Sequence, residues 1–140
     1  MHPLFDTPRP NGFHTLNAYL FTEAPERLIQ FAQDVFYAQE LSRTTHPDSG
    51  IIRNCILQIG DSCFMIAQAS DAFTGMRSAF YLYVNDVDGT YQRALEHGAS
   101  SVFEAADMEF GDRQAGIVDP AGNYWWISQR LLASDYSSSY

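Results

Sequence analysis

The chain repeats one pattern of hydrophobic periodicity, and this duplication restricts its fold more than any other feature of the sequence. In each copy, a stretch of alternating residues is followed by a segment with helical spacing and then by further strand-like stretches. Tyr81 follows Tyr19 by 62 positions, and Trp126 follows Met65 by 61. This near-constant offset predicts two copies of a β-α-β-β-β unit that fill almost the whole chain.

The second copy carries the clearest local signals. Phe80, Leu82 and Val84 alternate with tyrosines, which is typical of a strand with two different faces. Asp86 can cap the helix that follows, because its carboxylate accepts hydrogen bonds from unpaired backbone N–H groups. Gly98 can adopt the left-handed conformation that ends a helix. Three short strands are then expected, at residues 101–103, 114–118 and 124–128.

The first copy begins with a strand expected over residues 15–21. Leu16, Ala18 and Leu20 share one face of this strand, because side chains alternate along it. The segment 25–37 has apolar residues at spacings of three and four, which predicts an amphipathic helix. We expect that helix to pack on the face formed by the three apolar residues.

A hairpin follows in the first copy, with strands over 53–59 and 62–68. A two-residue turn between them places Cys55 opposite Ile66. Cys63 then points to the other face of the sheet, because the side-chain period of a strand is two. The sequence therefore predicts two free thiols, with no disulfide and no shared metal.

Composition restricts the classes of function. The chain has 140 residues, of which 46% are hydrophobic, and this is enough for one domain with a real core. A net charge of −9 opposes binding to nucleic acid. No apolar run approaches the roughly 20 residues of a membrane span, and the N-terminus lacks the features of a signal peptide. We expect a cytoplasmic protein that binds neither nucleic acid nor membrane.

We expect one domain over residues 1–140. It is divided into an arm, a first βαβββ module, a second βαβββ module and a tail, at residues 1–12, 13–70, 77–130 and 131–140.

The closing motif of the second copy carries a family resemblance. It reads Gly111-Asp112-Arg113, then Gly116-x-Val118-Asp119-Pro120-x-Gly122-Asn123-x-Trp125-x-Ile127. This is similar to the vicinal oxygen chelate superfamily, which includes glyoxalase I, bleomycin-resistance proteins and extradiol dioxygenases. The resemblance covers about residues 15–130. It implies an α+β fold in which two βαβββ modules form curved mixed sheets around a cleft, with the helices on the outer face. It also implies a homodimer.

The resemblance further implies where a metal would bind in this chain. In metal-dependent members, the ligands come from the first and last strands of each module, and these positions correspond to Asn17, Met65, Ala79 and Trp126. None of the four is a histidine or a glutamate, whereas a catalytic divalent site needs about three such ligands. We therefore expect no metal, no cofactor and no catalytic residue.

Aromatic side chains are expected to line the cleft in place of metal ligands. Strand alternation places them on the face opposite the helices, together with a few polar groups, as in many ligand pockets. The alternative is that these rings fill a closed sheet face or a dimer interface. Residues 104–112 are expected to form an acidic surface loop at the rim, and Trp125 is expected in the core. Arg113 either binds an anionic group at the cleft mouth or pairs with Asp112 or Asp119. The residues expected to contact a ligand are Asn17, Tyr19, Asn54, Met65, Tyr81, Tyr83, Phe110, Arg113, Tyr124 and Trp126.

The resemblance and the missing ligands together give one leading hypothesis. The chain is expected to be a metal-free, small-molecule-binding protein of the bleomycin-resistance type, which sequesters an aromatic compound, such as a cationic antibiotic, in an aromatic cleft. One alternative is a glyoxalase-like lyase, isomerase or dioxygenase with an atypical site. A second alternative is a dimeric interaction module without a ligand.

Overall fold

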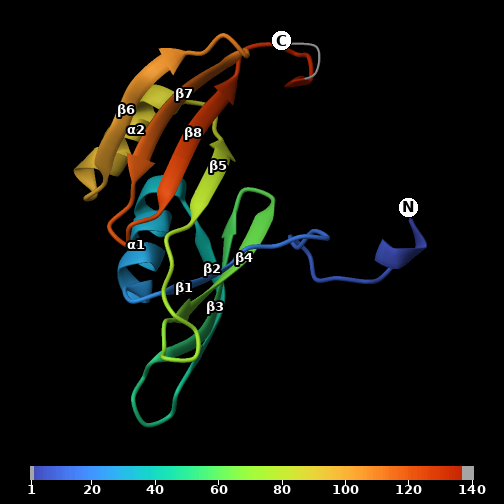
Figure 1. The fold of residues 1–140 in the computed structure, drawn as a ribbon, viewed down its shortest axis with the longest axis vertical. Coiled ribbons are helices and arrows are strands. Elements are labelled where there is room, and N and C mark those ends of the chain that lie inside the picture. Colours follow the sequence, from blue (N-terminus) through green and yellow to red (C-terminus); the bar gives the residue numbers. More distant parts are fainter. Residues whose placement is uncertain (1, 137–140) are drawn as a thin grey trace.

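The computed structural model describes residues 2–136 and contains two modules with the same order of elements (Figure 1). The first module consists of β1 (Tyr19–Thr22), α1 (Pro25–Phe36), β2 (Gln39–Thr45), β3 (Ile52–Ile59) and β4 (Ser62–Gln68). The second consists of β5 (Ala79–Tyr83), α2 (Val87–Glu96), β6 (Ser100–Asp107), β7 (Asp112–Val118) and β8 (Tyr124–Arg130). A short 3-10 helix, η1 (Pro3–Phe5), lies in the N-terminal arm. The predicted fold class, α+β with two βαβββ modules, is confirmed.

Each module forms its own four-stranded mixed sheet. The strand orders are β1-β4-β3-β2 and β5-β8-β7-β6, with the first pair of each order parallel. Tyr19 lies opposite Met65 in the first sheet, and Tyr81 lies opposite Trp126 in the second. The repeat seen in the sequence therefore corresponds to equivalent positions in space. β1 and β5 lie at the edges of their sheets.

Several local predictions are confirmed. Cys55 pairs with Ile66 across the hairpin, and both cysteines are free and buried. Asp86 caps α2 by accepting a hydrogen bond from the Gly89 backbone N–H at 3.0 Å. Gly98 has a φ of +98°, the left-handed conformation that ends the helix.

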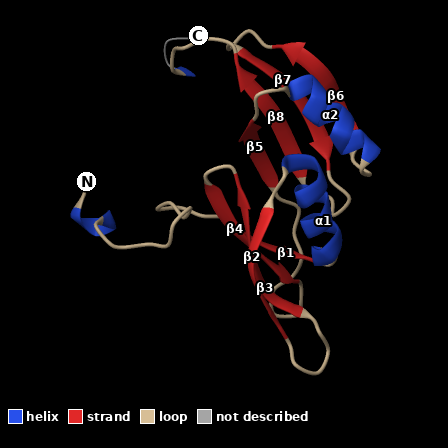
Figure 2. Ribbon diagram, turned by 180° about the vertical axis from the view of Figure 1, so that it is seen from behind, coloured by secondary structure: helices blue, strands red, loops and turns tan. Residues whose placement is uncertain are grey.

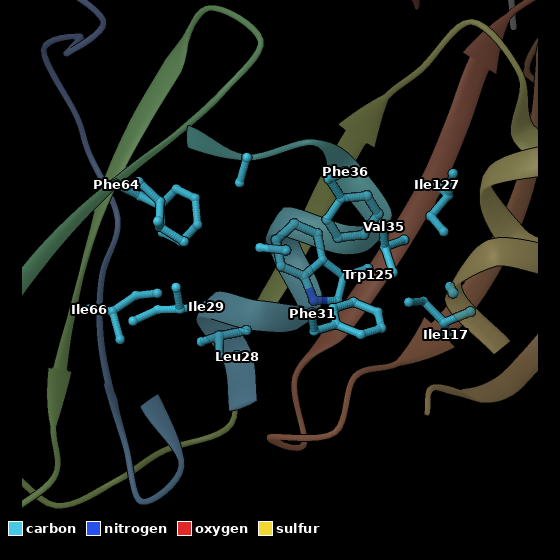
Figure 3. Close-up of a cluster of buried hydrophobic side chains, with 14 of the residues drawn as sticks. Leu28, Ile29, Phe31, Val35, Phe36, Phe64, Ile66, Ile117, Trp125 and Ile127 are labelled. Carbon is cyan, nitrogen blue, oxygen red and sulfur yellow. The ribbon is translucent and has the colours of Figure 1, made fainter. Parts of the chain in front are cut away.

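One hydrophobic core joins the two modules. Figure 3 shows side chains of α1 between Ile66 of the first sheet and Ile127 of the second. Trp125 is buried, as predicted, and its ring lies 4.4 Å from that of Phe80 and 4.7 Å from that of Phe36. Because rings from both modules contact each other here, the two halves bury a shared apolar surface.

The turn between β7 and β8 explains much of the closing motif. The buried Asp119 carboxylate accepts hydrogen bonds from the backbone N–H groups of Ala121 at 2.8 Å and Asn123 at 3.1 Å. It also accepts from the indole Nε1–H of Trp125 at 2.7 Å and from the Asn123 side-chain amide. The Asn123 amide oxygen accepts from the Ser78 backbone N–H at 2.9 Å. Ser78 comes directly before β5, so this bond ties the turn to the start of that strand.

Two predictions about local structure are wrong. The first strand begins at Tyr19 rather than at residue 15, and Leu16 is 88% exposed instead of packing on α1. The Asn17 side chain bonds to both backbone groups of His14, at 2.8 and 2.7 Å, and this folds the chain before it enters the sheet.

The predicted acidic loop over residues 104–112 is also wrong. Residues 104–107 belong to β6, and only residues 108–111 connect it to β7. Asp112 begins β7 and is fully buried. A run of acidic residues favours a surface position, but Asp112 is buried because its carboxylate accepts hydrogen bonds from side chains of distant segments.

The uncovered sides of the sheets determine where a ligand can bind. Helix α2 lies in front of the second sheet in Figure 2 and behind it in Figure 1, so it covers one side of that sheet, and α1 lies where the two modules meet. The N-terminal arm projects away from the sheets in both views. Neither helix within residues 2–136 has the length and apolarity needed to cross a membrane.

Candidate ligand-binding site

A column of three aromatic rings lies on the first module. The rings of Tyr19 and Phe21 stack at 4.9 Å and 18°, and those of Phe21 and Phe73 stack at 5.2 Å and 14°. They line a cavity of about 610 Å³, together with apolar residues of β3 and β4 and the side chains of His46 and Arg53. Tyr19 is 48% exposed and Phe73 60%, so their rings are accessible to a ligand.

Three of the predicted site residues meet at this column. The Asn54 side-chain amide donates a hydrogen bond to the Tyr19 hydroxyl at 3.2 Å, and Met65 lies opposite Tyr19 in the sheet. Strand alternation places Phe21 on the same face as Tyr19. Sequence reasoning missed Phe73 as a site residue, because it lies in the linker and carries no periodic signal.

A second cavity, of about 390 Å³, lies at the junction of the two modules. Asn17, Tyr81 and Tyr83 line it, and Phe80 and Trp125 contribute apolar surface. Asn17 therefore lies at the junction rather than in the first cavity, and its amide is engaged with the backbone of His14.

The buried Asp112 carboxylate lies at the centre of a polar cluster on the second sheet. One carboxylate oxygen accepts hydrogen bonds from the hydroxyls of Tyr81 at 2.7 Å, Tyr83 at 3.2 Å and Tyr136 at 2.6 Å. The other oxygen accepts from Arg130 at 3.0 Å. Burial raises the pKa of Tyr81 above its ordinary value of 10.0, and its contacts with Tyr136 and Asp112 act in the same direction, opposed by Ser128. Tyr81 is thus a hydrogen-bond donor at neutral pH.

Tyr124 and Trp126 form a second aromatic group on the same sheet. Their ring centroids lie 5.9 Å apart at 43°, and both side chains are half-buried. The Arg77 guanidinium lies 5.4 Å from the centroid of the Tyr124 ring and donates to its hydroxyl at 3.1 Å. This ring already binds a cation of the chain itself.

The remaining two predicted site residues have protein partners. Arg113 donates to Asp88 at 2.8 Å and to Asp107 at 2.9 Å, and not to either of the aspartates considered from the sequence. These bonds lower the pKa of Asp88 below its ordinary value. The Phe110 ring makes an edge contact with Tyr136 at 6.3 Å, and the Phe110 carbonyl accepts from Arg130 at 2.6 Å.

The residues at the family's metal positions do not fit a divalent metal. Asn17 is bonded to the backbone, and Met65, Ala79 and Trp126 offer no hard donor atom of the kind that such sites use. Within residues 2–136, no group of three His, Cys, Asp or Glu side chains could hold an ion. We therefore derive no chemical step through a metal.

Comparisons with known proteins agree with this fold. A model of the Glyoxalase/Bleomycin resistance protein/Dioxygenase superfamily matches residues 12–127, and the chain belongs to this superfamily. An uncharacterized protein of Mycobacterium tuberculosis is 30% identical over 135 residues, covering 89% of this chain and 79% of its relative.

Solved structures show the same similarity. TioX from Micromonospora sp. ML1 has a TM-score of 0.68 at 26% identity, covering 83% of this chain and 98% of that chain. A glyoxalase/bleomycin resistance protein/dioxygenase family enzyme from Burkholderia phytofirmans PsJN also has a TM-score of 0.68. Its identity is 22%, and the match covers 83% of this chain and 97% of that chain, so this likeness concerns the fold.

Proposed function

We propose that the protein is a metal-free, small-molecule-binding protein of the bleomycin-resistance type, which sequesters a planar aromatic compound. The observation that carries this proposal is the accessible column of Tyr19, Phe21 and Phe73 beside a cavity of about 610 Å³. Phe21 lies between the other two rings, so the faces left for a flat ligand to stack on are the outer faces of the end rings, Tyr19 and Phe73. The volume lies within the range typical of small-molecule pockets.

The charges around the column bear on the kind of compound. Arg53 and His46 line the cavity, and an arginine beside an aromatic surface can bind an acidic substituent of a flat ligand. This lining favours a neutral or anionic aromatic compound at the first sheet over the cationic antibiotic expected from the sequence. The Asn54 amide, already close to Tyr19, supplies a polar group that can orient the ligand.

We further propose that two copies of the chain assemble and complete each other's cleft. Strands β1 and β5 each have one side without a neighbouring strand, where backbone groups can pair with another chain, although the Phe21 carbonyl of β1 already accepts from the Met76 N–H. Leu16 is 88% exposed and Leu4 in the projecting arm is 73% exposed, which is unfavourable unless another surface covers them. In such a homodimer, the ring column of one chain would face the tyrosines and Trp126 of its partner.

A pair of linker variants tests the ligand proposal. Thermal-shift and calorimetric titrations with a panel of planar aromatic acids and bases should identify ligands of the wild-type protein. Phe73→Ala should weaken their binding about tenfold, because it removes one ring of the column. Met76→Ala is the matched control, since Met76 is 65% exposed in the same linker but does not line the cavity.

Two results would refute the proposal. The first is no binding across the panel, and the second is an equal loss of affinity in the two linker variants. Either result would assign the ring column a structural role in the sheet or in a dimer interface.

A further inference from the structure

Tyr136 joins the Asp112 cluster from the C-terminal tail, outside the two modules. Its hydroxyl lies 2.6 Å from the carboxylate oxygen of Asp112 and 3.3 Å from the hydroxyl of Tyr81. Its ring lies over the guanidinium of Arg130 at 4.7 Å, and its edge contact with Phe110 is at 6.3 Å. The tail thus places a phenol on the uncovered side of the second sheet.

The contacts of this phenol are those expected of a bound ligand. A buried, charged acceptor receives its hydroxyl, a cation covers its face and an aromatic ring touches its edge. The other partners are built into the sheet: Asp112 begins β7, Arg130 ends β8 opposite it, and Tyr81 lies on β5. The ring of Tyr136, in contrast, is still 37% exposed and is joined to the sheet by a short segment without regular structure after β8. Arg130 also donates to the Ser134 carbonyl at 3.1 and 2.8 Å, so side-chain contacts rather than a place in the sheet hold the tail at this site.

We propose that Asp112, Tyr81 and Arg130 form a binding site for a phenolic hydroxyl group, which Tyr136 fills in the free protein and which a phenol-bearing ligand fills by displacing Tyr136. This inference rests on the proposed function, since it names a chemical feature of the aromatic ligand. The hydroxyl and ring of the ligand take the place of those of Tyr136. The Asp112 carboxylate therefore has a phenolic hydroxyl donor both before and after the exchange. The tail is in this sense a competitor built into the chain.

Competition of this kind has a measurable size. If Tyr136 occupies the site nine-tenths of the time, the site is free in one molecule of ten, and the apparent affinity for a phenol is reduced about tenfold. Removal of the Tyr136 ring should raise the apparent affinity for a phenol by the same factor of about ten. A hydrogen bond to a buried carboxylate should also favour a phenol over the same ring without a hydroxyl by about tenfold or more.

The experiment uses 4-methylphenol as the probe and toluene as its partner without the hydroxyl. Both are titrated by calorimetry and by amide NMR into the wild-type full chain, Tyr136→Ala and Tyr136→Phe. Tyr136→Ala should bind 4-methylphenol about tenfold more tightly than wild type, with shifts at the amides of Asp112 and Arg130, and should bind toluene about tenfold more weakly than 4-methylphenol. Tyr136→Phe keeps the competing ring without its hydroxyl, so it should fall between wild type and Tyr136→Ala.

Tyr37→Ala is the matched control. The ring of Tyr37, at the C-terminal end of α1, also lies over an arginine, Arg93, at 4.6 Å, and makes none of the hydrogen bonds described for Asp112. This variant should bind 4-methylphenol as wild type does. The proposal is wrong if Tyr136→Ala binds the two probes equally, or if it binds 4-methylphenol no better than wild type.

The outcome for this site is separable from that for the ring column. If the Tyr136 variants do not support a phenol site but binding of planar compounds still depends on Phe73, only the present inference is wrong. A phenol that binds while the planar compounds do not would move the ligand site to the second sheet.

Discussion

Replacement of Asp119 by alanine tests how the closing turn supports the junction of the modules. The variant removes one buried carboxylate and leaves two buried side-chain donors without their acceptor, the Trp125 indole N–H and the Asn123 amide. Each buried donor left unpaired costs about 1–3 kcal/mol. The loss of the bonds to the backbone N–H groups of Ala121, which is half-buried, and Asn123, which is buried, adds to this cost. We expect a total loss of about 3–4 kcal/mol in the free energy of unfolding.

The assay is urea unfolding followed by far-ultraviolet circular dichroism, since fluorescence would also report the local change at Trp125. When the protein is heated instead, the same loss of stability should lower the melting temperature by about 10–15 °C in a domain of this length. Asp61→Ala is the control, because Asp61 occupies the turn of the other hairpin, is exposed and contacts only the neighbouring Ser62 hydroxyl, at 3.1 Å, among the hydrogen bonds described. That control should change stability by no more than about 0.5 kcal/mol.

A double-mutant cycle isolates the bond to the indole. Trp125→Phe keeps an aromatic ring at the junction and removes the N–H donor. Combined with Asp119→Ala, it should show a coupling energy of about 1.5 kcal/mol or more. The reasoning is refuted if Asp119→Ala costs less than about 1 kcal/mol, or if it costs no more than Asp61→Ala.

Three further predictions concern pH, ligand and assembly. Burial raises the pKa of Cys55 to about 11, so the folded state keeps a proton that the unfolded state releases above pH 9. The free energy of unfolding should therefore fall as pH rises from about 9 to about 11. In urea unfolding, Cys55→Ala should show a shallower fall than wild type, and an identical fall would assign the effect to other groups. Trp126→Ala should weaken a stacked ligand by about 1 kcal/mol in calorimetric titration; an unchanged affinity would exclude the second sheet from the site. Leu16→Asp should convert a dimer to a monomer in light scattering, because it places a charge on an exposed apolar position; a wild-type monomer would contradict the proposed assembly.

The parts of the fold that depend on neighbouring residues could be predicted from the sequence. The hairpin register follows from a two-residue turn, and the helix cap at Asp86 and stop at Gly98 follow from single side chains. The repeat offset matched Tyr19 with Tyr81 and Met65 with Trp126, and the two matched pairs hold equivalent positions in the two sheets. In each case, the physical cause lies within a few residues or in the period of the element.

The parts that could not be predicted depend on contacts between distant segments. Asp112 is buried because tyrosines from β5 and the tail and an arginine from β8 surround it. No local sequence pattern predicts that these distant residues meet. Phe73 joins the ring column from a linker without periodicity. Strand alternation predicts Leu16 in the core, but the bonds between Asn17 and His14 fold the chain before Tyr19, where the strand begins.

The shared core makes the two halves of the duplication depend on each other. Side chains of both helices enter one core, and the ring of Trp125 in the second module packs on Phe36 of the first. A chain severed in the linker should therefore yield fragments that are unstable alone and recover their structure only when mixed.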